Sequence, residues 1–286
     1  MRRSWRRTLS GVGRGVVQHN LSIVAAGVAF FGFLALVPTL SSIISVWGLF
    51  ADPARIGSNF GTLRRVLPPA AYELVHQQLV RVLAINPKTL GWGALGSAAI
   101  ALWSARQGTQ AIMDATHIAF GTLDPRGYFR QVLVSLGITL GAIVVSVLTI
   151  AFAILVPAVL SRIGLGATSS TLIKYLRWPV LAVVVFTALV ALYRWIPNRE
   201  STWRQMLPGA LLASLGWIAL SIGYSAFVTS FASYERTYGS LGAVVALMLW
   251  FWISSFMVLL GAELNSQLLR EDESRRELSA VSEGRR

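Results

Sequence analysis

The segment TYGSLGAVVALMLWFWISSFMVLLGA, residues 237–262, contains no charged side chain. A helix needs about 20 residues, within a range of about 17–25, to cross the hydrocarbon core of a bilayer. The segment therefore predicts a membrane-spanning helix. Glu263 follows it directly, so an ionisable group stands at the very end of the apolar run.

Further charge-free runs of the same kind occur along the chain, at 21–50, 89–105, 131–161, 178–193 and 205–234. Two of them, 89–105 and 178–193, are short and need flanking arginine side chains that extend toward the headgroups. Of the 286 residues, 55% are hydrophobic and 13% are charged, whereas soluble domains are about 45–50% apolar and about 25% charged. We therefore predict an all-α, polytopic membrane helix bundle with six transmembrane helices.

The basic residues predict how this bundle is oriented. Most of the 25 Lys and Arg residues fall on the side of the six-helix path that holds both termini, and Lys-rich and Arg-rich loops stay in the cytoplasm. Both termini are therefore predicted to be cytoplasmic, although the first loop, 51–88, opposes this orientation with five basic residues. The net charge of +13 is assigned to anionic lipids on the cytoplasmic face and not to nucleic acid, because the basic residues border apolar runs.

Three segments follow from this pattern. Residues 1–20 are a basic, interfacial N-terminal segment, in which Trp5, Leu9, Val12 and Val16 share one helical face. Residues 21–268 form the transmembrane domain, with an amphipathic outer loop at 51–88. Residues 269–286 form a polar cytoplasmic tail, helical at first and then disordered. The apolar run after the basic N-terminus is too long for a cleavable signal peptide.

Side chains that carry chemistry are scattered. The chain has no cysteine, which excludes thiolate metal sites and cysteine nucleophiles. His19, His76 and His117 fall on different sides of the predicted membrane, and the carboxylates outside the tail occur singly. We therefore expect no metal, no cofactor and no catalytic residue, and a protein that is not an enzyme. Oligomeric state is left open.

Polar side chains at the ends of two predicted spans are the candidate functional residues. Arg106, Gln110 and Asp114 are spaced by four on the second helix, a polar stripe expected to face the bundle interior or a water-filled cavity. Glu263 and Asn265 approach from the same predicted side. Two interpretations stay open: the charged residues are headgroup anchors, or Arg106 and Glu263 form a buried pair that lines a pathway.

Glycine and proline positions add two further predictions. Gly137 and Gly141 form a G-x-x-x-G pattern, which indicates close helix packing inside the bundle or, as the second reading, a dimer interface. Prolines interrupt three of the apolar runs, at Pro38, Pro157 and Pro208. Such breaks free backbone carbonyl groups, which either bind ions and substrates or are satisfied by neighbouring helices.

Several short motifs are specific enough to indicate a family. They are YRWIPN at 193–198, LPGA at 207–210, YGSLGA at 238–243, Trp250, GAELN at 261–265, AAGVAFF at 25–31 and LVP at 36–38. In these motifs the chain strongly resembles the YihY/BrkB family of bacterial inner-membrane proteins, some of which were long labelled ribonuclease BN. The resemblance covers residues 15–268. It departs from the family at ATHIAF, residues 115–120, where the family tends to have Asn.

The family-motif positions in this chain are Phe30, Pro38, Tyr193, Pro197, Asn198, Pro208, Gly209, Tyr238, Gly239, Gly242, Trp250 and Gly261. The resemblance implies six spans and a multi-pass protein of the cell inner membrane. We expect an envelope protein that acts as a transporter or a flippase-like exporter of a lipid or anionic amphiphile. A structural scaffold is the alternative, and a tRNA-processing ribonuclease, as the old label implies, is the third reading.

Overall fold

The structure is a computed structural model that describes residues 5–50, 92–162, 166–197, 199, 201–230 and 240–283. All regular secondary structure in these ranges is helical. The helices are α1 (Trp5–Gln18), α2 (Leu21–Phe50), α5 (Trp92–Phe120), α6 (Tyr128–Arg162), α7 (Gly166–Trp195), α8 (Trp203–Ser230) and α10 (Ser240–Glu283). A helix satisfies its own backbone hydrogen bonds, which is why apolar runs of this length adopt it in a membrane.

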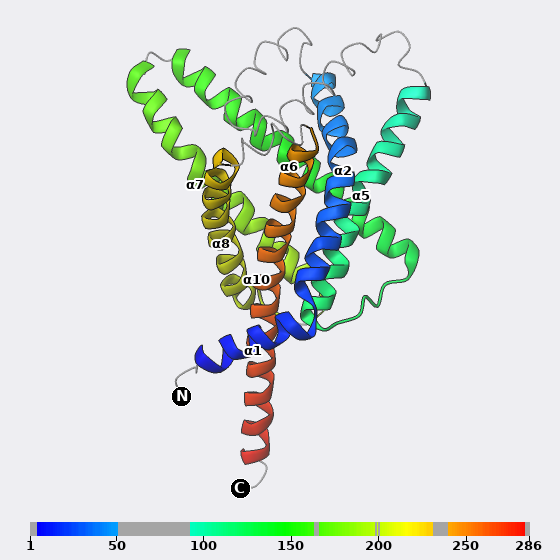
Figure 1. Ribbon diagram of the computed structural model, residues 1–286, viewed down its shortest axis with the longest axis vertical. Helices are drawn as coiled ribbons and strands as arrows, with labels where there is room; N and C mark the ends of the chain where they lie inside the picture. Colours follow the sequence, from blue (N-terminus) through cyan, green and yellow to red (C-terminus); the bar gives the residue numbers. More distant parts are fainter. Residues whose placement is uncertain are drawn as a thin grey trace.

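The last helix is the centre of the bundle. With 44 residues, α10 is about 66 Å long, so it extends well beyond a hydrocarbon core of about 30 Å. Figure 1 shows it running along the long axis of the molecule, with its C-terminal part projecting past the other helices. α10 contacts α8, α2, α5 and α1. The α10 packing surface therefore determines where these four helices lie.

The first helix crosses α10 at the end from which α10 projects (Figure 1). The chain then turns by 61° between α1 and α2 at Asn20, whose φ is 49°. Asparagine is one of the few residues that adopts this left-handed conformation readily. The turn places α1 and the C-terminal part of α10 at one end of the bundle. At the other end, α6 and α7 lean away from α2 and α5 (Figure 1).

Within the described ranges, three helices are long and apolar enough to cross a membrane, or four if the bent pair α1 and α2 counts as one span. They are Tyr128–Thr149, Trp203–Tyr224 and Val244–Leu278, together with the pair Arg6–Gln18 and Leu21–Leu36. A shorter apolar segment, Ala182–Trp195, lies in α7. The all-helical fold class is confirmed, whereas six crossings and cytoplasmic termini stay predictions.

Each of the six apolar runs lies at least in part within one long described helix. The two short runs, 89–105 and 178–193, belong to α5 and α7, which have 29 and 30 residues. The helix also continues through Pro38, Pro157 and Pro208, so the prediction that these prolines interrupt the spans is wrong. The outer loop 51–88 lies outside the described residues. The polar tail remains helical through Glu283, further than predicted.

The N-terminal helix is only partly the lipid-facing element that its pattern predicted. Val12 is buried with Leu264 and Leu268 of α10, because α1 lies across that helix. Leu9 stays 62% exposed. One part of the apolar face of α1 therefore packs against α10, and another part is exposed on the outside of the bundle.

The expected close packing at Gly137 and Gly141 is wrong. A Cβ added at either residue would meet nothing within 4 Å, and both lie on an exposed part of α6. The close approach occurs between Gly209 of α8 and Gly261 of α10, where a Cβ on either glycine would collide with the carbonyl oxygen of the other. A spacing of four in one helix does not reveal which face meets a neighbour.

Candidate functional site

Glu263 of α10 is fully buried. Its Oε2 lies 2.9 Å from Nδ1 of His19, at the break between α1 and α2. Its Oε1 accepts a 2.8 Å hydrogen bond from Nε2 of Gln267. The carboxylate also presses against α1 at Gly15, where an added Cβ would collide with Oε1. The buried acid is thus paired and enclosed by helices from opposite ends of the chain.

Asn265, also fully buried, joins α10 to α8. Its Oδ1 accepts a hydrogen bond of 2.8 Å from the N–H of Gly209, and its Nδ2 donates one of 3.0 Å to the carbonyl oxygen of Met206. These backbone groups flank Pro208, which has no N–H of its own. The Asn265 amide therefore binds the α8 backbone on both sides of the proline.

Other helices reach the same part of α10. Tyr193 of α7 is fully buried, and its hydroxyl donates a 2.6 Å hydrogen bond to the carbonyl oxygen of Val258. Ser266 donates one of 3.4 Å to the carbonyl oxygen of Phe120, at the end of α5. We call Tyr193, Gly209, Gly261, Glu263 and Asn265 the α10 junction. In it, every buried polar side chain has a partner.

A second polar region lies between α5 and α6. Arg106 is only 9% exposed, and its Nη1 donates a 3.1 Å hydrogen bond to Oγ of Ser135. One turn further on, the hydroxyl groups of Thr109 and Thr139 lie 2.7 Å apart. The indole of Trp103 lies 4.6 Å from the guanidinium carbon. We call Arg106, Thr109, Ser135 and Thr139 the α5–α6 seam.

Arg106 and Glu263 therefore have different partners, so the interpretation in which they form a buried pair is wrong. The reason is that the two residues lie at different positions along the axis of the bundle. Glu263 lies one turn from Ser266, which contacts Phe120 at the end of α5. Arg106 precedes Phe120 by about 21 Å of helix, at 1.5 Å per residue. Both residues stand at the end of an apolar run in the sequence, yet in the bundle they lie at different positions along the helix axes.

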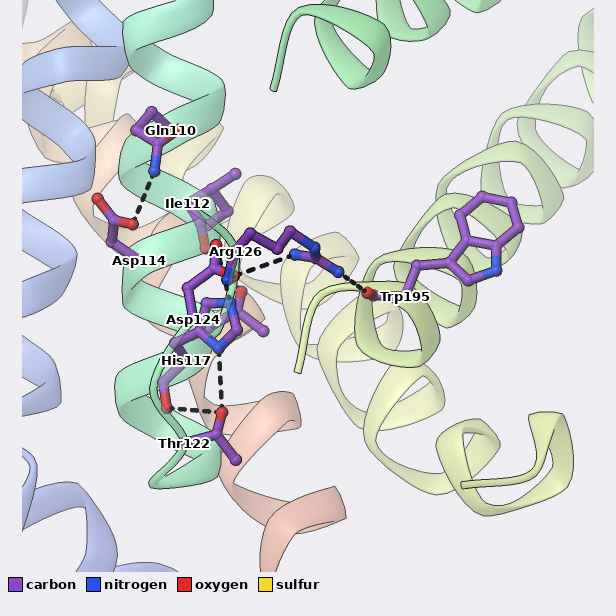
Figure 2. A network of polar contacts seen from close by, with 9 residues as sticks. Gln110, Ile112, Asp114, His117, Thr122, Asp124, Arg126 and Trp195 are labelled. Carbon is purple, nitrogen blue, oxygen red and sulfur yellow. Dashed lines mark hydrogen bonds and ion pairs between the residues drawn. The ribbon is translucent and has the colours of Figure 1, made fainter. Parts of the chain in front are cut away.

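The rest of the predicted stripe is not sealed inside the bundle. Nε2 of Gln110 donates a 2.8 Å hydrogen bond to Oδ1 of Asp114, and Figure 2 shows the two residues one turn apart on α5. Asp114 is exposed, Gln110 is half-buried, and Gln107 nearby is exposed as well. Of the three predicted residues, Arg106 is buried, and the Oε1 atom of the half-buried Gln110 is buried as well. We call Gln107, Gln110 and Asp114 the α5 polar stripe.

The connection between α5 and α6 contains a network that the sequence did not single out. Nη2 of Arg126 donates a 3.0 Å hydrogen bond to the carbonyl oxygen of Trp195, and Nη1 lies 3.6 Å from Asp124. Asp124 is also 3.7 Å from His117, whose Nδ1 lies 3.0 Å from the hydroxyl of Thr122. Figure 2 shows these side chains together, bridging the connection to the end of α7. The network fixes the ends of three helices.

The family-motif positions divide into three groups. Tyr193, Pro197, Gly209, Gly242 and Gly261 are buried. Phe30 is 48% exposed, Pro38 and Pro208 lie inside helices, and Trp250 packs edge to face on Trp217. Asn198, Tyr238 and Gly239 lie outside the described residues.

Two residues of the candidate site were missed by sequence reasoning. His19 was considered only as a metal ligand, and Gly15 was given no role. Their roles depend on a contact between α1 and α10, for which one sequence carries no signal. Within the described ranges, no group of three or more His, Cys, Asp or Glu side chains is arranged to hold a metal ion.

Comparison with known proteins shows which family the chain resembles. The profile of the family described as virulence factor BrkB matches residues 12–283. The chain is 31% identical to the Bacillus subtilis (strain 168) protein named "Putative ribonuclease-like protein YfkH", over 87% of this chain and 90% of that one. It is 30% identical to a UPF0761 membrane protein of Vibrio cholerae serotype O1 (strain ATCC 39315 / El Tor Inaba N16961), over 88% and 84%.

A UPF0761 membrane protein of Nitrosospira multiformis is 27% identical over 88% of this chain and 58% of its own length. No solved structure matches. The family profile covers nearly the whole chain, and it includes both the α10 junction and the α5–α6 seam. This chain therefore belongs to the BrkB family of membrane proteins.

Proposed function

We propose that this protein is a multi-pass inner-membrane transporter or flippase-like exporter that moves a lipid or anionic amphiphile. The observation that carries the proposal is the α5 polar stripe. Gln107 and Asp114 are exposed on a helix packed against apolar neighbours. Polar and charged side chains cost free energy in hydrocarbon and mark substrate pathways when they persist there.

The α5 polar stripe offers hydrogen-bonding partners for a lipid headgroup. A lipid that crosses a bilayer keeps its tails in hydrocarbon while its headgroup requires polar partners along the way. An exposed amide and carboxylate on the outer side of α5 supply hydrogen-bond donors and acceptors without sealing the tails inside the bundle. The buried Arg106 lies beside the stripe on the same helix. This arrangement favours lateral headgroup movement over an enclosed channel.

The α1 surface supports a position at an anionic membrane face. Arg6, Arg7 and Arg14 are exposed on α1, and so are Leu9 and Val17. Apolar side chains next to arginines suit the boundary between acyl chains and anionic headgroups. We propose that this face is cytoplasmic and that both termini lie there.

Lipid movement by the purified protein tests the function. The protein is reconstituted in liposomes that contain a phospholipid with a fluorescent headgroup, and a membrane-impermeant reductant quenches the fluorophores of the outer leaflet. Wild-type protein is expected to expose nearly all fluorophores to the reductant. The variant Gln107→Leu/Gln110→Leu/Asp114→Leu is expected to slow the movement at least about tenfold, since each lost polar partner raises the barrier.

A matched control keeps this test specific. Gln18→Leu removes one exposed amide from α1 and is expected to leave the rate unchanged. Equal rates in the wild-type protein and the triple variant would overturn the role of the stripe. Protein-free liposomes give the background rate.

The topology is testable because the chain has no cysteine. Single cysteines at Leu9 and Leu278, which are 62% and 72% exposed, provide labelling sites near the two ends. A membrane-impermeant maleimide is expected to label both only after the cells are opened. Labelling of intact cells at either position would contradict cytoplasmic termini.

A structural scaffold is the second candidate, and the α10 junction favours it. Glu263 and Asn265 are fully buried and hydrogen-bonded, as expected for groups that fix helices in place. Folded wild-type protein that moves no lipid above the background would favour the scaffold over the transporter.

We also propose that the protein is not an enzyme. Among the described residues, buried Glu263 pairs with His19, whereas buried Arg106 hydrogen-bonds to Ser135 between α5 and α6, so these two ionisable groups do not share one site. The name of the Bacillus relative suggests a direct check on RNA. Purified protein is expected to leave RNA intact, and cleavage that co-purifies with the protein and is lost in a point variant would contradict the proposal.

A further inference from the structure

Arg106 is a buried charged residue that has no counter-charge in the ion pairs of the described residues. It lies in the middle of α5 and is more than nine-tenths buried. Its guanidinium face is covered by Trp103 at 4.6 Å, and its Nη1 hydrogen-bonds to Ser135. Its Nε is buried without a hydrogen-bond partner. The side chain is therefore held in place on one side, whereas its Nε lacks a partner on the other.

The hydroxyl groups of the seam do not neutralise this charge. Ser135 donates its own hydrogen to the carbonyl oxygen of Val132 at 3.0 Å, and Thr139 donates to the carbonyl oxygen of Ser135 at 2.7 Å. Ser135 therefore acts toward Arg106 as a neutral acceptor. The ion pairs recorded among the described residues are formed by other side chains.

The contrast with Glu263 is informative. That buried acid has the His19 ring at 2.9 Å and the Gln267 amide at 2.8 Å. Arg106 has one hydroxyl and one aromatic face. A buried charge without a counter-charge is unfavourable and is retained where a ligand supplies the missing charge.

The free part of Arg106 has a defined chemistry. Nη1 of the guanidinium hydrogen-bonds to Ser135, and the other edge of the group is formed by Nε, which has no hydrogen-bond partner, and Nη2. This edge presents two parallel N–H donors, which match two oxygens of a phosphate or carboxylate. A lysine ammonium at the same place has no such fork.

We infer that Arg106 is an oxyanion-binding residue, which takes a phosphate group through its Nε edge while Ser135 and Trp103 hold the guanidinium in place. For a lipid phosphate the inference rests on the proposed function, since the α5 polar stripe delivers the headgroup. A free phosphate ion has the same chemistry, and the experiment separates the two sources.

The test measures ligand-dependent thermal stabilisation of purified protein in detergent. The probes are dioctanoyl phosphatidic acid, dioctanoyl phosphatidylcholine and inorganic phosphate. For the wild-type protein, phosphatidic acid is expected to raise the melting temperature more than phosphatidylcholine does. Stabilisation by inorganic phosphate as well identifies free phosphate as a ligand, and stabilisation by phosphatidic acid alone identifies a lipid headgroup.

The variants assign the effect to Arg106. Arg106→Gln is expected to abolish the preference for the anionic ligand, and Arg106→Lys to weaken binding about tenfold, since it keeps the charge and loses the fork. The control Arg130→Gln, at an exposed arginine of α6, is expected to behave as wild type. The Lys variant keeps the test decisive if the Gln variant fails to fold.

Equal stabilisation of the wild-type, Gln and Lys proteins by phosphatidic acid would overturn the inference, and so would the absence of any anion-dependent shift in the wild-type protein. The lipid-movement assay separates the two proposals. Movement without preference for anionic lipids, unchanged in Arg106→Gln, overturns the inference and keeps the transporter. Anion binding that depends on Arg106 without lipid movement keeps the inference and overturns the transporter.

Discussion

The α10 junction and the α5–α6 seam are both polar regions in an apolar bundle, yet they are built differently. At the junction, Glu263 and Asn265 have no exposed surface and each bonds to another helix or to its own. At the seam, Arg106 is buried with an unpaired Nε. Paired groups hold helices together, whereas an unpaired buried charge costs stability unless something binds it.

This difference separates structural residues from candidate ligand-binding residues on physical grounds. The junction contacts connect α10 to α1, α7 and α8, so that loss of one contact loosens several helices. The seam connects only α5 and α6. Substitutions in the two regions should therefore change stability in opposite directions.

The largest effect is expected from Gly209→Val. The new side chain collides with the backbone of α10 at Gly261, and neither helix can give way without moving the other. We expect a loss of about 3 kcal/mol or more, seen as aggregated protein in size-exclusion chromatography. Gly223→Val is the matched control, since it lies on the same helix with nothing within 4 Å. Equal losses would show that helix propensity, and not the contact, is responsible.

A smaller but clear effect is expected from Asn265→Ala. It leaves the N–H of Gly209 and the carbonyl group of Met206 buried without their partner. Each unpaired group costs at least about 1 kcal/mol, so a loss of about 2 kcal/mol is expected, measured by thermal unfolding followed through tryptophan fluorescence. Gln205→Ala, which removes an exposed bond to Thr202, should cost much less. Similar losses would contradict the special role of Asn265.

Arg106→Met tests the other side of the comparison. Although Arg106 is buried, the apolar replacement removes an unpaired charge, and we expect stability in the absence of ligand to stay the same or rise by about 1 kcal/mol. The same thermal unfolding experiment measures it. A loss as large as that of Asn265→Ala would show that Arg106 is structural and would remove the distinction between the two regions.

The smallest effect is expected from Gly137→Ala on α6. Nothing lies within 4 Å of the added Cβ, and alanine is the better helix former, so the change should stay within about 0.5 kcal/mol or stabilise slightly. Gly15→Ala, the same chemical change against the Glu263 carboxylate, is expected to destabilise. If Gly137→Ala also destabilises, α6 has a helix partner outside this chain.

Sequence reasoning succeeded where the decision was local. The run at 237–262 is helical from Ser240 onward and continues into Glu283, and the resemblance carried by YRWIPN and GAELN led to the correct family. It failed for the interpretation in which Arg106 pairs with Glu263, and for the expected close helix packing at Gly137 and Gly141. Both failures concern which residues of different helices stand at the same level or face each other.

The apolar runs were enough to establish a membrane helix bundle, because a backbone in hydrocarbon must satisfy its own hydrogen bonds and a helix does so within one segment. The partners of the polar residues depend on how the helices are stacked. His19 meets Glu263 across 244 positions of chain, and Gly209 meets Asn265 across 56. Such contacts follow from the bend at Asn20 and the close approach of α8 to α10, which only the packed structure decides.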